Sequence, residues 1–241
     1  MDNTEENITL QELQARFDGQ MEIWRSSACR EELLHIISKH QPKEGIFDKV
    51  VCLATGSFCE REYEERNDLS GARRKSNQRH MLQLACAVDV AAELRKSGQA
   101  VELLAQEPDY KPLDLELLAS QGVTILKVDE EAGLGLAKDH VGPRTVLLEF
   151  FVYKDDDQIA SDFFGMDAGL IVGTPARLFG GSVASRWQRI RNEVGARSVP
   201  SLAEEFDRTH DGCDLPCSGE HQGAFSGLVV YWPKTEKSEK S

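Results

Sequence analysis

The first segment that could carry chemistry is a glycine turn that follows an apolar run. Residues 49–54 read Lys-Val-Val-Cys-Leu-Ala and predict a buried strand, and the chain continues as Thr55, Gly56, Ser57 and Phe58. A glycine at the carboxyl end of a parallel strand lets backbone N–H groups approach a phosphate or a carboxylate. The Gly-x-Gly-x-x-Gly pattern is absent, so a plain tight turn is the competing interpretation. We take these four residues as candidate ligand-binding residues.

A second candidate segment follows the next apolar run. Glu107 and Asp109 flank Pro108 just past residues 100–105. In nucleotide-binding sheets an acidic residue at this place receives ribose hydroxyls, and the proline fixes the local backbone. The competing interpretation is a helix entry in which Asp109 caps the helix that starts near Pro112. Glu107 and Asp109 complete the candidate ligand site.

Two histidines and two cysteines near the C-terminus are of the types that bind zinc. They are His210, Cys213, Cys217 and His221. Their spacing is not that of a usual zinc knuckle, and an irregular loop with unligated cysteines is the favoured interpretation. We therefore predict no metal site, with these four residues as the alternative, and no stoichiometric zinc on Cys213 and Cys217.

The remaining polar groups do not form a catalytic set. Arg73, Arg74 and Lys75, with Arg79, make a basic cluster that favours a solvated loop or a localisation signal over a phosphate or acidic-partner site. His80 and His140 are isolated, and a lone histidine is more often structural or exposed than catalytic. No nucleophile–base pair can be assembled, so no catalytic residue is assigned and the question of enzyme activity stays open.

The elements that must position these segments alternate between strand and helix patterns. Helical spacing over 77–97 and a proline start at 112 give helices between the apolar runs. The fold class is therefore α/β, a Rossmann-like doubly wound, mainly parallel sheet of about five to six strands with helices on both faces. The predicted strands are 49–54, 100–105, 123–128, 145–153 and 169–173, with an edge strand at 228–232.

The flanking regions show weaker patterns. Thr9 and Glu12 form a capping box for a helix to about Phe17, and Ser26 or Ser27 opens a helix through Lys39. We expect residues 1–45 to be a helical cover, 46–233 the α/β domain and 234–241 a disordered tail. Within the domain, 60–75 is expected to be a mobile loop, and helices are expected at 184–194 and from Ser201 to about 208.

Several short segments recur in an order and spacing that resemble the SRR-like (sensitivity to red light reduced) domain family. The match covers roughly residues 50–175. The segments are Gly-Ser-Phe at 56–58, Ala-Gln-Glu-Pro-Asp-Tyr at 105–110, Asp114, Glu116 and Leu118, Gly-Val-Thr-Ile-Leu at 122–126, Glu-Glu-Ala-Gly at 130–133, and Leu-Ile-Val-Gly at 170–173.

The resemblance implies a regulatory protein of signalling or circadian type, in a family without an established catalytic activity. Many relatives carry a proline–histidine–cysteine segment after the fourth strand, whereas residues 150–154 here read Phe-Phe-Val-Tyr-Lys. The alternative function is a nucleotide- or S-adenosylmethionine-dependent transferase, because such enzymes share the order of strand, glycine turn, helix, strand and acidic end. No cofactor is assigned, and the partner is an unknown protein or small molecule.

The charge of the chain limits its partners. The formal net charge is −13, with 41 acidic against 28 basic residues. This excess predicts no nucleic-acid and no membrane binding, and a monomer or weak dimer. No apolar run reaches the length of a membrane span, the first residues are acidic, and six cysteines are scattered through the chain. We therefore expect a cytoplasmic protein that is also found in the nucleus.

Overall fold

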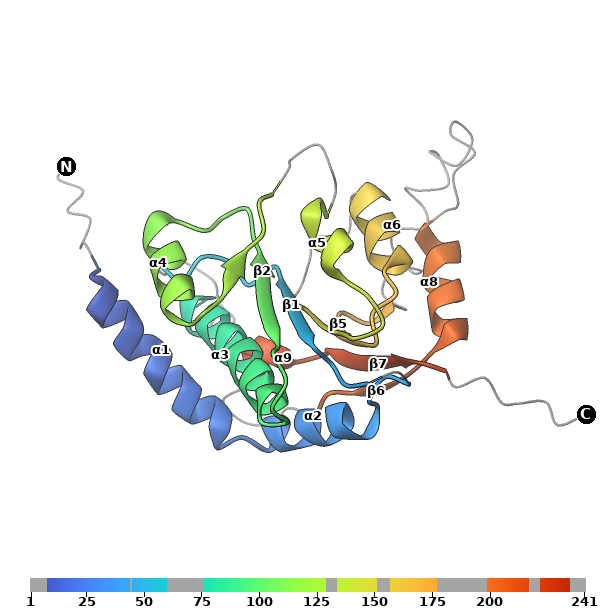
Figure 1. Cartoon of the computed structure of the whole chain (residues 1–241). Helices are drawn as coiled ribbons and strands as arrows, with labels where there is room; N and C mark the ends of the chain where they lie inside the picture. Colours follow the sequence, from blue (N-terminus) through green and yellow to red (C-terminus); the bar gives the residue numbers. More distant parts are fainter. Residues whose placement is uncertain are drawn as a thin grey trace, which may run out of the picture.

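The computed structural model describes residues 8–43, 45–59, 76–128, 134–150, 157–176, 199–216 and 222–234. These residues form one seven-stranded sheet between two layers of helices (Figure 1). The strands are β1 Lys49–Leu53, β2 Glu102–Gln106, β3 Thr124–Ile125, β4 Thr145–Glu149, β5 Leu170–Gly173, β6 His210–Asp214 and β7 Val229–Pro233. The helices are α1 Leu10–Arg25, α2 Ala28–Lys39, α3 Ser76–Arg95, α4 Pro112–Ser120, α5 Leu136–His140, α6 Asp157–Gly165, α8 Val199–Thr209 and α9 Gln222–Phe225.

The sheet has the strand order β3-β2-β1-β4-β5-β7-β6. Strands β1 to β5 pair in parallel, and β7 is antiparallel to both of its neighbours. The α/β class, the mainly parallel sheet and the helices on both faces are confirmed. The sheet has seven strands rather than the expected five to six, because the polar segment of β6 also pairs in it. The doubly wound order places β1 between β2 and β4, at the centre of the parallel part of the sheet.

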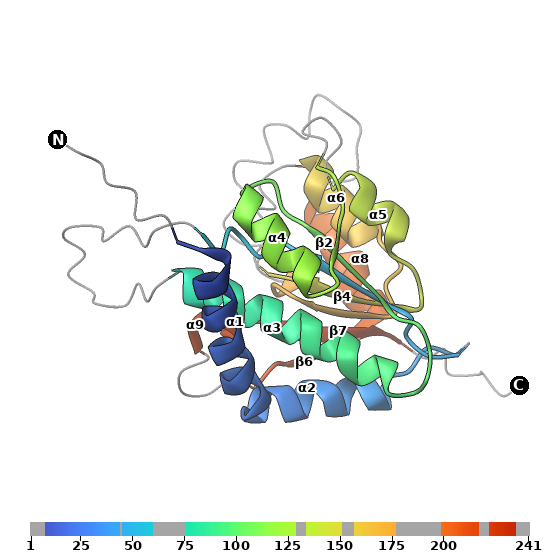
Figure 2. The ribbon, with the colours of Figure 1, turned by 60° about the vertical axis from the view of Figure 1, so that its left-hand side comes forward.

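Strand residues alternate between two hydrophobic clusters, as the pleat requires. Val50 and Cys52 of β1 face α1, α2, α3, α4 and α9, whereas Val51 and Leu53 face α5, α6 and α8. The two helical layers lie on opposite sides of the sheet in Figures 1 and 2. Burial of both faces explains the continuous apolar runs by which the strands are recognised in the sequence.

The N-terminal helices extend the first layer. Thr9 caps α1 with the predicted capping box, and Ser27 caps α2. The prediction that the first helix ends near Phe17 is wrong, because α1 continues to Arg25. A buried apolar stripe runs along α1, and its burial stabilises the helix beyond Gly19. The stripe consists of Leu13, Phe17, Met21 and Trp24.

Several other predicted boundaries also differ from the structure. The segment from His210 to Asp214 is strand β6, not the expected irregular loop, because its backbone pairs with β7 although its side chains are polar. Strand β7 is interior and not an edge strand, and the third strand contracts from 123–128 to two residues. Helix α8 begins at Val199, before Ser201. Three predicted segments lie outside the described residues. They are the loop at 60–75, the helix at 184–194 and the tail at 234–241, except for its first residue.

Candidate functional site

The turn after β1 lies where the chain connections diverge. From β1 the chain passes through α3 to β2 on one side, and from β3 through α5 to β4 on the other, with α3 and α5 on opposite faces. In open α/β sheets ligands bind at the carboxyl ends of the strands beside such a switch point. Residues 54–59, which we call the β1 turn, leave the sheet there.

The backbone of the β1 turn is unusual at two positions. Ala54 has φ 58° and Gly56 has φ 72°, both in the left-handed region. Glycine adopts this region freely, but an alanine there costs on the order of 1–2 kcal/mol. Such strain persists only where surrounding contacts fix the conformation, and it is concentrated at ligand sites. The contacts that fix this turn come from the ends of β2, α4 and α3.

Glu107 holds the turn from the end of β2. Its Oε2 accepts a hydrogen bond from the Gly56 N–H at 2.9 Å, and its Oε1 accepts one from the Asp109 N–H at 3.1 Å. The structure thus brings Gly56 and Glu107 together. The side chain of Asp109 is exposed, and the N-cap of α4 is Lys111 rather than Asp109. The capping role considered for Asp109 is therefore not its role in this structure.

Asp114, in the first turn of α4, is fully buried and holds the other half of the β1 turn. Its carboxylate accepts hydrogen bonds from the Ser57 hydroxyl at 2.7 Å and from the Phe58 N–H at 3.0 Å. It also accepts from the Lys111 N–H at 2.8 Å, where it joins the helix N-terminus, a favourable place for a carboxylate. Ser57 and Phe58 are consequently buried structural residues of the turn as well as candidate site residues.

The Cys59 thiol lies beside the same carboxylate. Its Sγ donates to Asp114 Oδ1 at 2.8 Å. Burial, together with the hydrogen bond to Asp114 and its negative charge, raises the pKa of Cys59 to about 12. At neutral pH Cys59 is therefore a thiol, and a thiol is a poor nucleophile.

Tyr110 packs against the start of the turn. The hydroxyls of Thr55 and Tyr110 lie 2.6 Å apart and share a hydrogen bond, and the Tyr110 ring lies 5.7 Å from that of Phe58. Burial raises the pKa of Tyr110 well above its usual value. Tyr110 thus acts here as a neutral hydrogen-bonding and packing group.

His80, in the first turns of α3, covers Gly56. A Cβ built at Gly56 would lie 2.5 Å from His80 Cε1, so the imidazole fills the space that the glycine leaves. His80 Nδ1 lies 2.9 Å from the Ser57 carbonyl oxygen and must carry the proton of this hydrogen bond, since a carbonyl only accepts. The histidine that is isolated in the sequence is thus part of the candidate site.

The same edge of the sheet carries a second buried carboxylate, at the end of β4. Glu149 is fully buried and accepts a hydrogen bond from the Thr174 N–H, after β5, at 2.7 Å. A Cβ at Gly173 would lie 2.8 Å from Glu149 Oε2, which explains the glycine at the end of β5. Sequence reasoning missed Glu149 because it lies inside the apolar run of the fourth strand.

The cysteine and histidine candidates near the C-terminus are only partly described. His210 and Cys213 lie in β6, whereas Cys217 and His221 are outside the described residues. The His210 ring stacks on Phe206, which lies on one face of the sheet. Cys213 packs against the hydrophobic cluster on the opposite face. Among the described residues no group of three or more His, Cys, Asp or Glu side chains is placed to hold a metal ion.

A shallow cavity of about 330 Å³ lies along β6 and β7, lined by His210, Gly212, Tyr231 and neighbouring residues. Strands β4, β5 and β7 separate β6 from β1, so this cavity is distant from the β1 turn. Of the basic cluster, Arg73, Arg74 and Lys75 are outside the described residues. Arg79 lies beside His80, and burial lowers its pKa.

Comparison with known proteins identifies the family. The family model of the SRR1 domain matches residues 30–232. The chain belongs to the SRR1 domain family. The match is longer than the segment 50–175 that carries the resemblance in the sequence, and it includes β6 and all but the last residue of β7. No curated protein matches the chain.

Among solved structures, this SRR1 domain is similar to a Staphylococcus aureus protein assigned as a caffeoyl-CoA O-methyltransferase. The two share 10% sequence identity with a TM-score of 0.39, over 96% of this chain and 95% of that one. Within the described part of the chain, no helix is long and apolar enough to cross a membrane.

Proposed function

We propose that this SRR1 domain is a regulatory binding module, of signalling or circadian type, whose ligand site is the β1 turn with Glu107 and Asp109. The observation that carries the proposal is the left-handed Ala54 at the end of the central strand. The strained turn is held by groups from three other elements, which is the expected construction of a preformed ligand site. We propose the cytoplasm and the nucleus as its locations.

The chemistry of the turn supports binding rather than catalysis. The Ser57 hydroxyl donates to a carboxylate, Asp114, while the His80 ring nitrogen faces the Ser57 carbonyl rather than its hydroxyl. The raised pKa of Cys59, about 12, keeps its thiol protonated. Ser57, His80 and Cys59 therefore do not form an activated nucleophile.

The test is a thermal-shift screen of the full chain with nucleotides, S-adenosylmethionine and tetrapyrroles, followed by calorimetry on any compound that stabilises it. Glu107→Ala removes the contact with Gly56, and Glu116→Ala, on the exposed face of α4, is the matched control. We expect affinity to fall at least about tenfold in Glu107→Ala, which corresponds to about 1.4 kcal/mol, and to be unchanged in Glu116→Ala. A compound that binds all three proteins equally would place the site elsewhere.

A nucleotide- or S-adenosylmethionine-dependent transferase is the second candidate, and one observation favours it. Glu107, the acidic group at the end of β2, lies directly against the glycine turn of β1, which is the layout that receives a ribose in Rossmann-like enzymes. Transfer of a labelled methyl group from S-adenosylmethionine to an acceptor, lost in Glu107→Ala, would favour the transferase. Reversible binding without chemical change would favour the binding module.

A further inference from the structure

Two backbone N–H groups of the β1 turn are already bonded to carboxylates. In Rossmann-like sheets the N–H groups of this turn usually bind a phosphate. Here the Gly56 N–H donates to Glu107 at 2.9 Å and the Phe58 N–H donates to Asp114 at 3.0 Å. These two donors, on either side of Ser57, therefore have anionic partners from the protein itself.

The same pairing occurs beside the other strands of this edge. The Thr174 N–H after β5 donates to Glu149 at 2.7 Å, and the Leu134 N–H before α5 donates to Asp162 at 3.1 Å. Two of the four carboxylates, Asp114 and Glu149, are fully buried. The arrangement is thus repeated from β1 to β5 and is not confined to one turn.

His80 closes the remaining approach to the glycine. In a phosphate-binding turn, the missing side chain lets the ligand come close to the backbone. At Gly56 the position of that side chain lies 2.5 to 2.9 Å from three atoms of the His80 ring. A phosphate group would have to displace the imidazole and break its hydrogen bond to Ser57.

Within the described part of the chain, cations also lie near this edge, but none is bonded to the acceptors of the two N–H groups in place of these donors. Lys138 lies 3.6 Å from Asp162, on the α5 side, and Arg79 lies beyond His80, with its Nη2 3.5 Å from His80 Nε2. The charge of Arg16 acts on Cys59, at the far end of the turn from Gly56. The partly exposed Glu107 contacts the turn directly at Gly56, so an incoming phosphate would meet its carboxylate first. Like charges in a partly desolvated site repel strongly.

We infer that the ligand of this site carries no phosphate at the β1 turn and is a neutral or cationic molecule with hydroxyl or amino groups. Carboxylate oxygens accept hydrogen bonds from such groups, and each oxygen has two lone pairs. This inference rests on the proposed function, because it specifies the ligand class of the site proposed there. It separates this SRR1 domain from sheets of the same topology that bind dinucleotides through their phosphates.

The experiment is an amide ¹H–¹⁵N NMR titration of the deuterated full chain with four probes. Adenosine and S-adenosylmethionine lack phosphate, whereas ATP and inorganic pyrophosphate carry it. We expect one or both of the first pair to shift the amide signals of Gly56 and Asp109, and ATP and pyrophosphate to need at least a tenfold higher concentration. Glu107→Ala should remove the response to the first pair, with Glu116→Ala as the control.

The outcomes separate the two proposals. If ATP or pyrophosphate shifts the Gly56 signal at or below the concentration at which adenosine does, the inference is wrong and the ligand site stands. If none of the four probes and no compound of the thermal-shift screen shifts the signals of the β1 turn, the proposed function itself is withdrawn, and the inference with it.

Discussion

Asp114 is a buried carboxylate that joins two segments far apart in the sequence. It accepts hydrogen bonds from Ser57 and Phe58 of the β1 turn and from Lys111 at the start of α4. Removing such an acceptor leaves buried donors without a partner, which costs more than the hydrogen bonds themselves contribute. At the scale of single residues, Asp114 therefore fixes the conformation of the second half of the turn, as Glu107 fixes that of the first.

We predict that Asp114→Ala lowers the free energy of unfolding by about 3 kcal/mol, the cost of leaving several buried donors unsatisfied. Urea denaturation of the full chain measures it. Glu116→Ala, an exposed acid on the same helix, is the control and should change stability by less than about 0.5 kcal/mol. Equal effects of the two substitutions would show that the contacts of Asp114 do not stabilise the fold.

How far the candidate site can be predicted from sequence depends on the range of its contacts. Gly56 and Glu107 follow neighbouring parallel strands, so topology alone brings them to one edge of the sheet. Asp114 has the sequence signature of an ordinary first-turn helix acid, and His80 that of an isolated histidine. Their contacts with the turn depend on how α4 and α3 pack, which periodicity does not specify.

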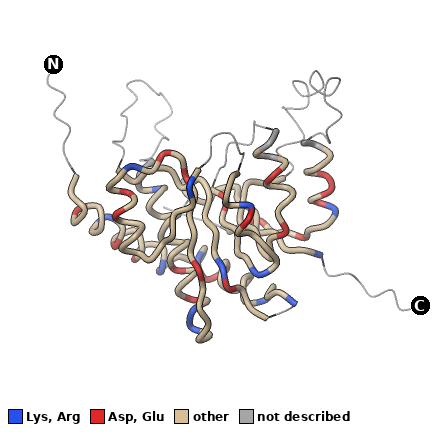
Figure 3. Tube along the Cα trace, turned by 45° about the horizontal axis from the view of Figure 1, so that its top comes forward, with Lys and Arg blue, Asp and Glu red and all other residues tan. Residues whose placement is uncertain are grey.

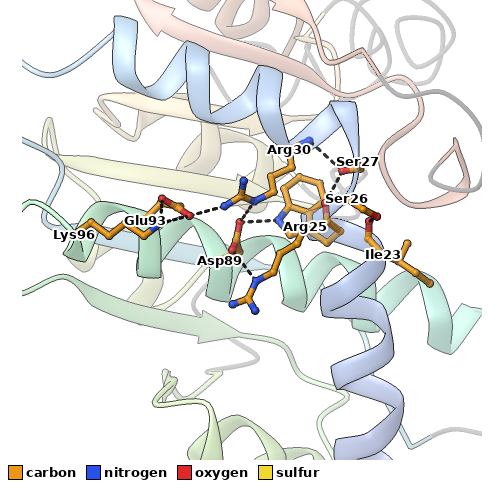
Figure 4. A network of polar contacts seen from close by, with 9 residues as sticks. Ile23, Arg25, Ser26, Ser27, Arg30, Asp89, Glu93 and Lys96 are labelled. Carbon is orange, nitrogen blue, oxygen red and sulfur yellow. Dashed lines mark hydrogen bonds and ion pairs between the residues drawn. The ribbon is translucent and has the colours of Figure 1, made fainter.

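At the scale of elements, another buried carboxylate attaches the N-terminal helices to α3 (Figure 4). Asp89 of α3 is 2% exposed and accepts hydrogen bonds from Trp24 Nε1 at 3.1 Å and from Arg30 Nε at 2.6 Å. Arg25 completes the group at 3.3 Å, and Arg30 also pairs with Glu93. Helix α1 precedes the family match, which begins at residue 30, yet it is tied to the domain core by this network.

We predict that Asp89→Ala destabilises the protein by about 2–3 kcal/mol, because it leaves the buried indole N–H of Trp24 without its acceptor and Arg30 with Glu93 alone. Lys96→Ala breaks the ion pair with Glu93 in which Lys96 is 71% exposed, and should cost at most about 1 kcal/mol. Thermal and urea denaturation measure both. A similar small cost for the two variants would contradict a structural role of the network.

The β6 edge carries a histidine whose surroundings disfavour its protonated form, which lowers its pKa. His210 stacks on Phe206, with ring centroids 4.0 Å apart, and burial lowers its pKa, although its hydrogen bond to the Phe206 carbonyl and the charges of Asp167 and Asp207 act in the opposite direction. Lys234 adds to the lowering. Below the usual pKa of about 6.5 the unfolded chain therefore binds a proton more readily than the folded one. This contribution to stability is complete above that pH and is lost as the pH falls towards the folded-state pKa.

We predict that the urea midpoint of the wild type falls between pH 7 and pH 5 by more than that of His210→Gln. His35→Gln changes an exposed histidine on α2 and should keep the wild-type dependence. An identical pH dependence in all three proteins would mean that His210 does not couple folding to protonation.

The elements that sequence patterns missed share one physical cause. Strand β6 reads His-Asp-Gly-Cys-Asp, without the apolar alternation by which a strand is recognised, and its partner β7 supplies the pairing. Helix α1 contains Gly19, which weakens local helix propensity, and packing on α3 extends it. Where burial and propensity agree, as in β1, β4 and α2, the sequence predicts the element. Where tertiary contacts determine whether an element forms, as in β6, the sequence pattern does not predict it.

At the scale of the whole molecule, the acidic excess determines which partners can approach. The formal net charge is −13, and Lys and Arg are interspersed with Asp and Glu along the described chain (Figure 3). Many of the described cations are paired with carboxylates, as Arg30 is with Asp89 and Arg144 with Asp48. Paired cations contribute little to the attraction of a distant polyanion.

We predict that the full chain does not bind duplex DNA with submicromolar affinity at 150 mM salt. Binding of DNA draws most of its free energy from the release of counterions when Lys and Arg neutralise phosphates, and a strongly acidic protein repels the duplex at long range. Fluorescence anisotropy of a labelled duplex of about 20 base pairs measures the affinity at several salt concentrations. Submicromolar binding that weakens steeply with salt would contradict the prediction, because the slope counts phosphate contacts. The same titration with single-stranded DNA controls for stacking on exposed aromatic rings, which depends less on charge.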